Sequence, residues 1–129
     1  MSVTINDALK ADLLDAIDAT FNSGTLEVRS GAAPGANNSA TGTVLATITL
    51  PADAFVATSA GVKASQGTWQ DASADATGTA AHFRLKNAAG TRVLEGTVGL
   101  SGADLNVSNT SLVAGQGFTV TSFPLSFNN

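Results

Sequence analysis

The sequence has no cysteine, few aromatic side chains and little charge. Among its 129 residues there are no Cys or Tyr, one Trp and one His, and only 12% of the residues are charged. The lack of Cys excludes disulfides, zinc–thiolate sites and cysteine nucleophiles. Six Lys and Arg residues without a basic cluster leave no electrostatic footprint for nucleic acid, so we expect no nucleic-acid partner.

Long apolar runs are also missing. No stretch approaches the length that spans a bilayer, and the first residues, MSVTINDALK, contain neither a basic n-region nor an apolar h-region. We therefore expect a soluble protein with no membrane partner, made in a cytoplasm without classical export.

Small residues dominate what is present. Hydrophobic residues make up 43% of the chain, many of them Ala and Val, while Thr, Ser, Asn and Gly supply most of the polar surface. This composition suits β-strands and tight turns better than helices. A chain of 129 residues is large enough to bury a core without disulfide or metal.

The clearest element is a hairpin in residues 80–100, where strands at 80–86 and 91–98 flank a turn containing Asn87 and Gly90. The period of two in the first strand predicts one buried face and one solvent-exposed face. The predicted buried face carries Ala81, Phe83 and Leu85, and the predicted exposed face carries Ala80, His82, Arg84 and Lys86.

Residues 7–21 are the one predicted helix, with Asn6 as N-cap, Asp7 in the first turn and a left-handed C-cap within residues 22–24. Helical periodicity gives it an apolar face made of Leu9, Leu13, Ala16, Ile17 and Thr20, with Leu14 and Phe21 at the border. Two interpretations stay open: the helix caps one open end or face of a β domain, or residues 1–22 form an arm that reaches a neighbouring subunit.

Residues 23–129 form the predicted β domain, in which short strands alternate with turns. Strands are expected at residues 25–30, 43–50, 55–59, 62–65, 68–70, 105–107 and 118–127. A change of parity near Ser122, next to Pro124, predicts a bulge or bend in the last of them, in an edge position. The expected fold is mainly β, an antiparallel β-sandwich or jelly-roll-like domain with one N-terminal α-helix. Its predicted core consists of Leu26, Val28, Val44, Ile48, Leu50, Phe55, Phe83, Leu85, Val93, Val98, Phe118, Val120 and Leu125.

Groups that carry catalysis are isolated along the chain. His82 is the only histidine, and Glu27 and Glu95 alternate with apolar residues, so we interpret them as outward charges that discourage edge pairing. Asp71 and Asp75 share one loop but match no calcium-loop spacing. The sequence therefore predicts no catalytic residue, no metal site and no cofactor.

The remaining candidates are residues for partner contact. The helix has more large apolar groups than a solvated helix needs, so part of its surface is expected to contact a neighbour. Trp69 is either a platform for a sugar ring or a partly buried anchor at the rim of a core or interface. The loop 31–42 lacks apolar anchors and is expected to offer free backbone groups to a partner. The candidate contact residues are Leu9, Leu13, Leu14, Ile17, Phe21 and Trp69.

A resemblance rests on four segments: TLEVRSGAAP, ATGTVLATITL, AAHFRLKNAAGTRVLEGTVGLSGADLNV and FTVTSFPLSF. Together, over residues 25–127, they resemble a group of small virion-associated proteins encoded in the structural regions of tailed bacteriophages and prophages. The resemblance brings no catalytic residue. It implies a structural virion protein, located in the virion and made in the host cytoplasm, foremost a capsid decoration or cement protein that stabilises the head.

The partners implied by this resemblance are the major capsid protein or other virion structural proteins, together with further copies of the chain in a homo-oligomer such as a trimer. The alternative is a tail- or neck-associated module that binds host surface glycans or another virion protein. In that alternative Trp69 and the Ser/Asn-rich loops form the contact surface.

Overall fold

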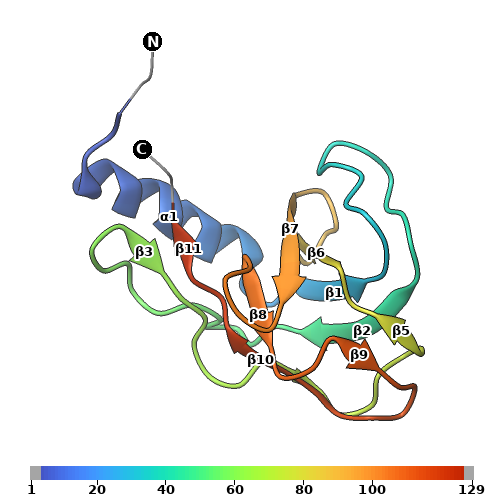
Figure 1. The fold of residues 1–129 in the computed structure, drawn as a ribbon. Helices are drawn as coiled ribbons and strands as arrows, with labels where there is room; N and C mark the ends of the chain where they lie inside the picture. Colours follow the sequence, from blue (N-terminus) through green and yellow to red (C-terminus); the bar gives the residue numbers. More distant parts are fainter. Residues whose placement is uncertain (1–3, 127–129) are drawn as a thin grey trace.

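The computed structural model describes residues 4–126, which contain one helix and eleven short strands. Seven strands form one sheet in the order β2-β1-β6-β7-β8-β10-β4, and the pairs β11-β3 and β5-β9 form two small sheets (Figure 1). The elements are α1 (Asp7–Phe21), β1 (Thr25–Arg29), β2 (Val44–Thr49), β3 (Val62–Lys63), β4 (Gln70–Asp71), β5 (Gly78–Thr79), β6 (His82–Lys86), β7 (Val93–Gly99), β8 (Leu105–Val107), β9 (Ser111–Leu112), β10 (Phe118–Ser122) and β11 (Leu125–Ser126).

The seven-stranded sheet curls until its two outer strands meet. The Thr47 amide of β2 donates to Asp71 Oδ2 of β4 at 3.0 Å, and the Asp75 amide donates to the Leu45 carbonyl at 2.8 Å. The result is a nearly closed, barrel-like sheet, in which β7 and β8 pair in parallel and the other ladders are antiparallel. The mainly β class with one N-terminal helix is confirmed, whereas a sandwich or jelly roll is not.

The hairpin predicted in residues 80–100 is confirmed. β6 and β7 pair antiparallel from His82↔Thr97 to Lys86↔Val93. The turn between them is closed by a hydrogen bond from the Gly90 amide to the Asn87 carbonyl at 2.9 Å, and Gly90 has φ +74°. A residue with a Cβ is strained at this φ, so the glycine fixes the turn.

Most of the predicted core is buried, and four of its members, Val44, Val93, Val98 and Leu125, are half-buried. The predicted core omits Leu45, although its side chain is only 1% exposed, because the alternation along the strand assigns it to the other face. The β1–β2 register shifts between Val28 and Arg29, so that Leu45 is an extra residue between two paired positions and turns inward with Ala46. Further core residues outside the prediction are Trp69, Leu105, Val107, Leu112 and Phe123.

The predicted bend in the C-terminal strand is present. β10 shifts register against β8 between Val120 and Ser122, and the chain then leaves the large sheet and pairs with β3 as β11. Pro124, which has no amide hydrogen, stands between the two strands. The last predicted strand residue, Phe127, lies outside the described residues.

Candidate interaction surface

The ends of α1 form as the sequence predicts. The Asn6 side chain accepts a hydrogen bond from the Leu9 amide at 3.0 Å, and Asp7 lies in the first turn. At the other end the Asn22 amide donates to the Asp18 carbonyl at 3.1 Å, and Ser23 takes a left-handed conformation with φ +62°. These caps satisfy backbone groups that a helix leaves free at its ends.

The buried face of α1 differs from the predicted one. Leu14 is 0% exposed and Phe21 5%, whereas Leu9 and Leu13 are 44% and 41% exposed. Leu14 and Phe21, predicted at the border, therefore face the β domain, and Phe21 belongs to the same core as the strands. Both are buried within their own chain, so in this structure neither is exposed to a partner. Ile17 is half-buried against the core.

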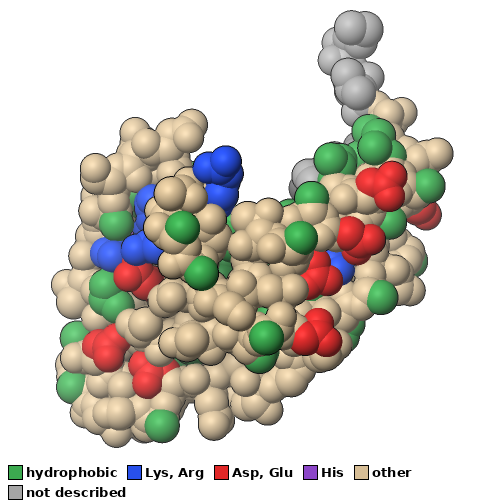
Figure 2. All heavy atoms as spheres, turned by 180° about the vertical axis from the view of Figure 1, so that it is seen from behind, with side chains coloured by type: hydrophobic (Ala, Val, Ile, Leu, Met, Phe, Trp, Pro, Cys, Tyr) green, Lys and Arg blue, Asp and Glu red, His purple; other side chains and the backbone are tan. Residues whose placement is uncertain are grey.

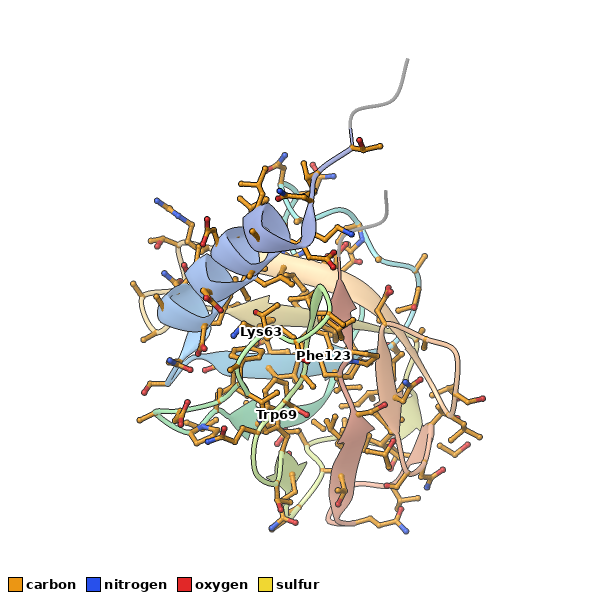
Figure 3. All side chains as sticks on the ribbon, turned by 90° about the vertical axis from the view of Figure 1, so that its left-hand side faces the viewer. Lys63, Trp69 and Phe123 are labelled. Carbon is orange, nitrogen blue, oxygen red and sulfur yellow. The ribbon has the colours of Figure 1, made fainter. Side chains whose placement is uncertain are left out.

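A buried lysine pairs with the inner side of the helix. The side chain of Lys63, in β3, is fully buried (Figure 3), and its Nζ lies 3.0 Å from Asp18 Oδ2 and 3.2 Å from Asp15 Oδ1. Nζ also donates to the Val56 carbonyl at 3.0 Å. A buried ammonium needs such partners, so the helix face that carries both aspartates has to turn toward β3.

The charges of Lys63, Asp15 and Asp18 stabilise one another. Burial by itself would lower the pKa of Lys63, but hydrogen bonds to Asp18 and Asp15 outweigh it and raise that pKa. Hydrogen bonds from Lys63 and then from Thr58 lower the pKa of Asp15. Lys63, which sequence reasoning did not single out, thus connects helix and β domain. The only signal for it was a lysine inside a short predicted strand.

Two of the candidate contact residues remain available to a partner. Leu9 and Leu13 lie one helical turn apart and are exposed on the same side of α1. Asp12, also exposed, lies between them in sequence. Figure 2 shows exposed hydrophobic and acidic side chains interspersed over the region of α1. We refer to Leu9 and Leu13 as the outer leucine pair.

Trp69 lies inside the molecule, not at its surface. It is 1% exposed, and its ring centroid lies 5.4 Å from that of Phe55 and 5.6 Å from that of Phe123 (Figure 3). Phe83 joins this cluster through an edge-on contact with Phe123. The indole is therefore a core anchor, and it has no face on which a glycan or a partner could stack.

The face of β6 that was predicted to be solvent-exposed is buried at His82 and Arg84 and half-buried at Lys86. Just before the strand the predicted order is reversed, because Ala80 is buried and Ala81 is exposed. His82 is 1% exposed and Arg84 4% exposed, because the loop 31–42 folds back across them. His82 Nδ1 lies 2.8 Å from the Gly31 carbonyl oxygen, and Arg84 Nη2 donates to the Asn38 carbonyl at 3.1 Å. The alternation in the sequence is real, but both faces of the strand are covered.

Glu95 completes this polar cluster and is not an outward charge. Its side chain is 6% exposed and accepts from Arg84 Nη1 at 2.6 Å and from the Gly35 amide at 2.8 Å. The loop is therefore held by side chains of β6 and β7, which replace the apolar anchors it lacks. A signal for this existed in the sequence: an arginine and a glutamate at facing positions of one hairpin, with a histidine two residues before the arginine.

The outer part of the loop remains accessible. Residues 36–43 are exposed, although Arg29 Nη1, from β1, donates to the Thr41 carbonyl at 3.3 Å. Backbone groups predicted to be free for a partner are thus partly used within the chain.

Within residues 4–126 no three His, Cys, Asp or Glu side chains are grouped closely enough to hold a metal ion. The part of the chain that the structure describes also contains no helix long and apolar enough to cross a membrane. Comparison with protein-family models, with curated proteins and with solved structures finds no match for this chain.

Proposed function

We propose that this chain is a structural protein of a tailed-phage virion, a decoration or cement protein that binds the capsid surface and stabilises the head. The proposal is supported by the resemblance of residues 25–127 to small virion-associated proteins, and a jelly-roll-like assignment of the β domain belongs to it. The observation that carries a binding role is the outer leucine pair. It lies exposed on a helix whose other side is fixed to the chain's own core.

A small apolar contact is sufficient for such a role. Each leucine of the pair is already more than half buried, so moving its exposed part into a partner's surface contributes about 0.6–1.3 kcal/mol. On a repeating lattice, copies joined in a homo-oligomer add their contacts, so the complex holds even where each contact is modest. The partners in this proposal are the major capsid protein or another virion protein and further copies of the chain.

The proposal assigns no catalytic role. The groups that acid–base chemistry would use have structural partners: His82 is held on the Gly31 carbonyl, and Glu95 on Arg84 and the Gly35 amide. Each is almost fully buried, so a substrate would have to displace the loop 31–42 to reach either of them.

The copy number in purified virions tests the location. Hundreds of copies per particle agree with capsid decoration, whereas a handful would instead indicate the tail or neck. Binding itself is tested with the double variant Leu9→Ser, Leu13→Ser on particles that lack the protein. We expect it to fold normally and to lose particle binding. Val113→Ser, which alters another exposed apolar residue, is the matched control and should bind normally. Full occupancy by the double variant would contradict the proposed surface.

A further inference from the structure

The large sheet is open beside β7, not at its ends. Its outer strands β2 and β4 are joined by the hydrogen bond from the Thr47 amide to the Asp71 side chain, and the Asp75 amide, in the loop after β4, donates to the Leu45 carbonyl of β2. β7 pairs with β6 along its length, but its ladder with β8 includes only Val98 and Gly99. Within residues 4–126, no strand is paired with the second edge of β7 from Val93 to Thr97.

The backbone groups at this edge can be identified from the hydrogen bonds at both ends of the hairpin. The Asn87 amide donates to the Arg92 carbonyl, and the Val98 amide donates to the Ala81 carbonyl. The backbone amide and carbonyl groups of the even-numbered residues of β7 therefore point toward β6. In an antiparallel pair the direction alternates along the strand. The amide and carbonyl groups of Val93 and Glu95 therefore point away from β6, into the open edge.

The next outward-pointing amide, that of Thr97, has a partner in a side chain. It donates to Asp104 Oδ2 at 3.0 Å, and the Thr97 hydroxyl donates to the same oxygen at 3.1 Å. Asp104 thus terminates the open edge at one end. Both of these hydrogen bonds use Oδ2, so the other carboxylate oxygen remains available for a cation.

A cavity of about 260 Å³ lies against this edge. Its lining is Phe83, Leu94, Glu95, Asp104, Phe123, Pro124 and Leu125. The wall opposite β7 contains Pro124, which has no amide hydrogen to donate. Residue 96 is a glycine, and a Cβ there would come within 2.7 Å of the Phe83 ring and 2.8 Å of Asp104 Oδ2. Five of the lining residues are apolar, and β7 adds hydrogen-bonding backbone groups. Of the two acidic residues in the lining, Glu95 uses its carboxylate on Arg84 and the Gly35 amide, so Asp104 supplies the carboxylate that is open to a ligand.

We propose that this edge binds an extended peptide segment of a partner by strand addition. The segment pairs with the outward amide and carbonyl groups of Val93 and Glu95. It places an apolar side chain in the cavity and a Lys or Arg, two residues away, beside Asp104. Main-chain pairing supplies affinity in this mode of recognition, and pockets for alternate side chains supply specificity.

Charge favours a cationic peptide over a second copy of this chain as the segment that binds the edge. The free oxygen of Asp104 at the end of the edge favours a cationic residue, and two residues along a strand return to the same face. A second copy of this chain is less well suited, because each copy has a formal net charge of −4. The proposal does not depend on a capsid location, so it can fail or succeed independently of the proposed function.

The test uses the full chain and the synthetic peptide acetyl-Thr-Lys-Thr-Leu-Thr-Lys-Thr-amide, which presents a leucine with a lysine two residues away in either direction. Amide hydrogen exchange and chemical shifts are followed by NMR during titration. At a peptide concentration of about ten times Kd, exchange at Val93 and Glu95 should slow about tenfold, since only about a tenth of the edge stays free. A peptide with serine in place of leucine is the control and should bind more weakly.

Two variants locate the contact. Val93→Pro removes an amide that points outward, which an edge strand tolerates, and should weaken peptide binding about fivefold through one lost hydrogen bond. Asp104→Asn keeps an acceptor for Thr97 and should weaken binding of the lysine peptide about two- to fivefold, but not that of a norleucine analogue.

The proposal is overturned if millimolar peptide leaves the Val93 and Glu95 amides of the unaltered protein unchanged, or if the changes fall on α1 instead. Protection of these amides that rises with protein concentration in the absence of peptide would also overturn it, because a second copy would then occupy the edge. These readouts need no variant, so the test stands even where Val93→Pro fails to fold.

Discussion

Replacing Arg84 by methionine should destabilise the protein severely and release the loop 31–42. In the structure Arg84 Nη1 donates to Glu95 Oε2 at 2.6 Å, and Nη2 donates to the Asn38 carbonyl at 3.1 Å. The side chains of Arg84 and Glu95 are 5% and 6% exposed. Arg84→Met would leave the Glu95 carboxylate buried without its cation, and such a loss costs about 3–5 kcal/mol.

This cost is a large part of the total stability. At about 0.05–0.15 kcal/mol per residue, a chain of 129 residues has a free energy of unfolding of about 6–19 kcal/mol. The double variant Arg84→Met, Glu95→Leu removes both charges and should be more stable than Arg84→Met alone by at least about 1 kcal/mol. It should not recover fully, because the Gly35 amide loses its acceptor.

Urea unfolding measures these differences, and amide exchange at Gly35 reports on the loop. Arg92→Met, in the same hairpin but exposed, is the control and should change stability by no more than about 0.5 kcal/mol. The loss in Arg84→Met should persist from about 0.05 M to about 1 M salt, since a buried pair is little screened. A loss under about 1 kcal/mol, or a double variant less stable than the single one, would refute this reasoning.

Three further results are expected. Leu14→Ala should cost about 2–5 kcal/mol in urea unfolding and the half-exposed Leu13→Ala no more than about 1 kcal/mol, and equal losses would contradict the observed helix rotation. Trp69 fluorescence should be blue-shifted and resistant to acrylamide quenching in the native protein, whereas strong quenching would show an accessible indole. Stability should fall with acid below about pH 4, because hydrogen bonds lower the folded pKa of Asp15 from 3.8, and with alkali above about pH 10.5, because the folded pKa of Lys63 is raised from 10.5. Unfolding is measured across pH. A Lys63→Met variant that still lost stability in alkali would disprove the role of Lys63.

The local structure of this protein was largely determined by its sequence. Residues 7–21 form the helix because Asn6 caps it and Ser23 with its neighbours ends it, and the hairpin forms because Asn87 and Gly90 fit its turn. These are interactions between residues close in the chain, so they can be predicted without knowing the fold. The mainly β class follows in the same way from turns at short intervals.

Only the tertiary structure decided what covers each face. Lys63 pairs with Asp18 across 45 residues, in the same helix orientation that buries Leu14 and leaves Leu13 exposed. The loop that buries Arg84 comes from 46 residues away in the sequence. A period of two shows that a strand has two different faces, but not whether a distant segment covers the polar one. Burial depends on which elements meet, and long-range ion pairs leave no periodic pattern in the sequence.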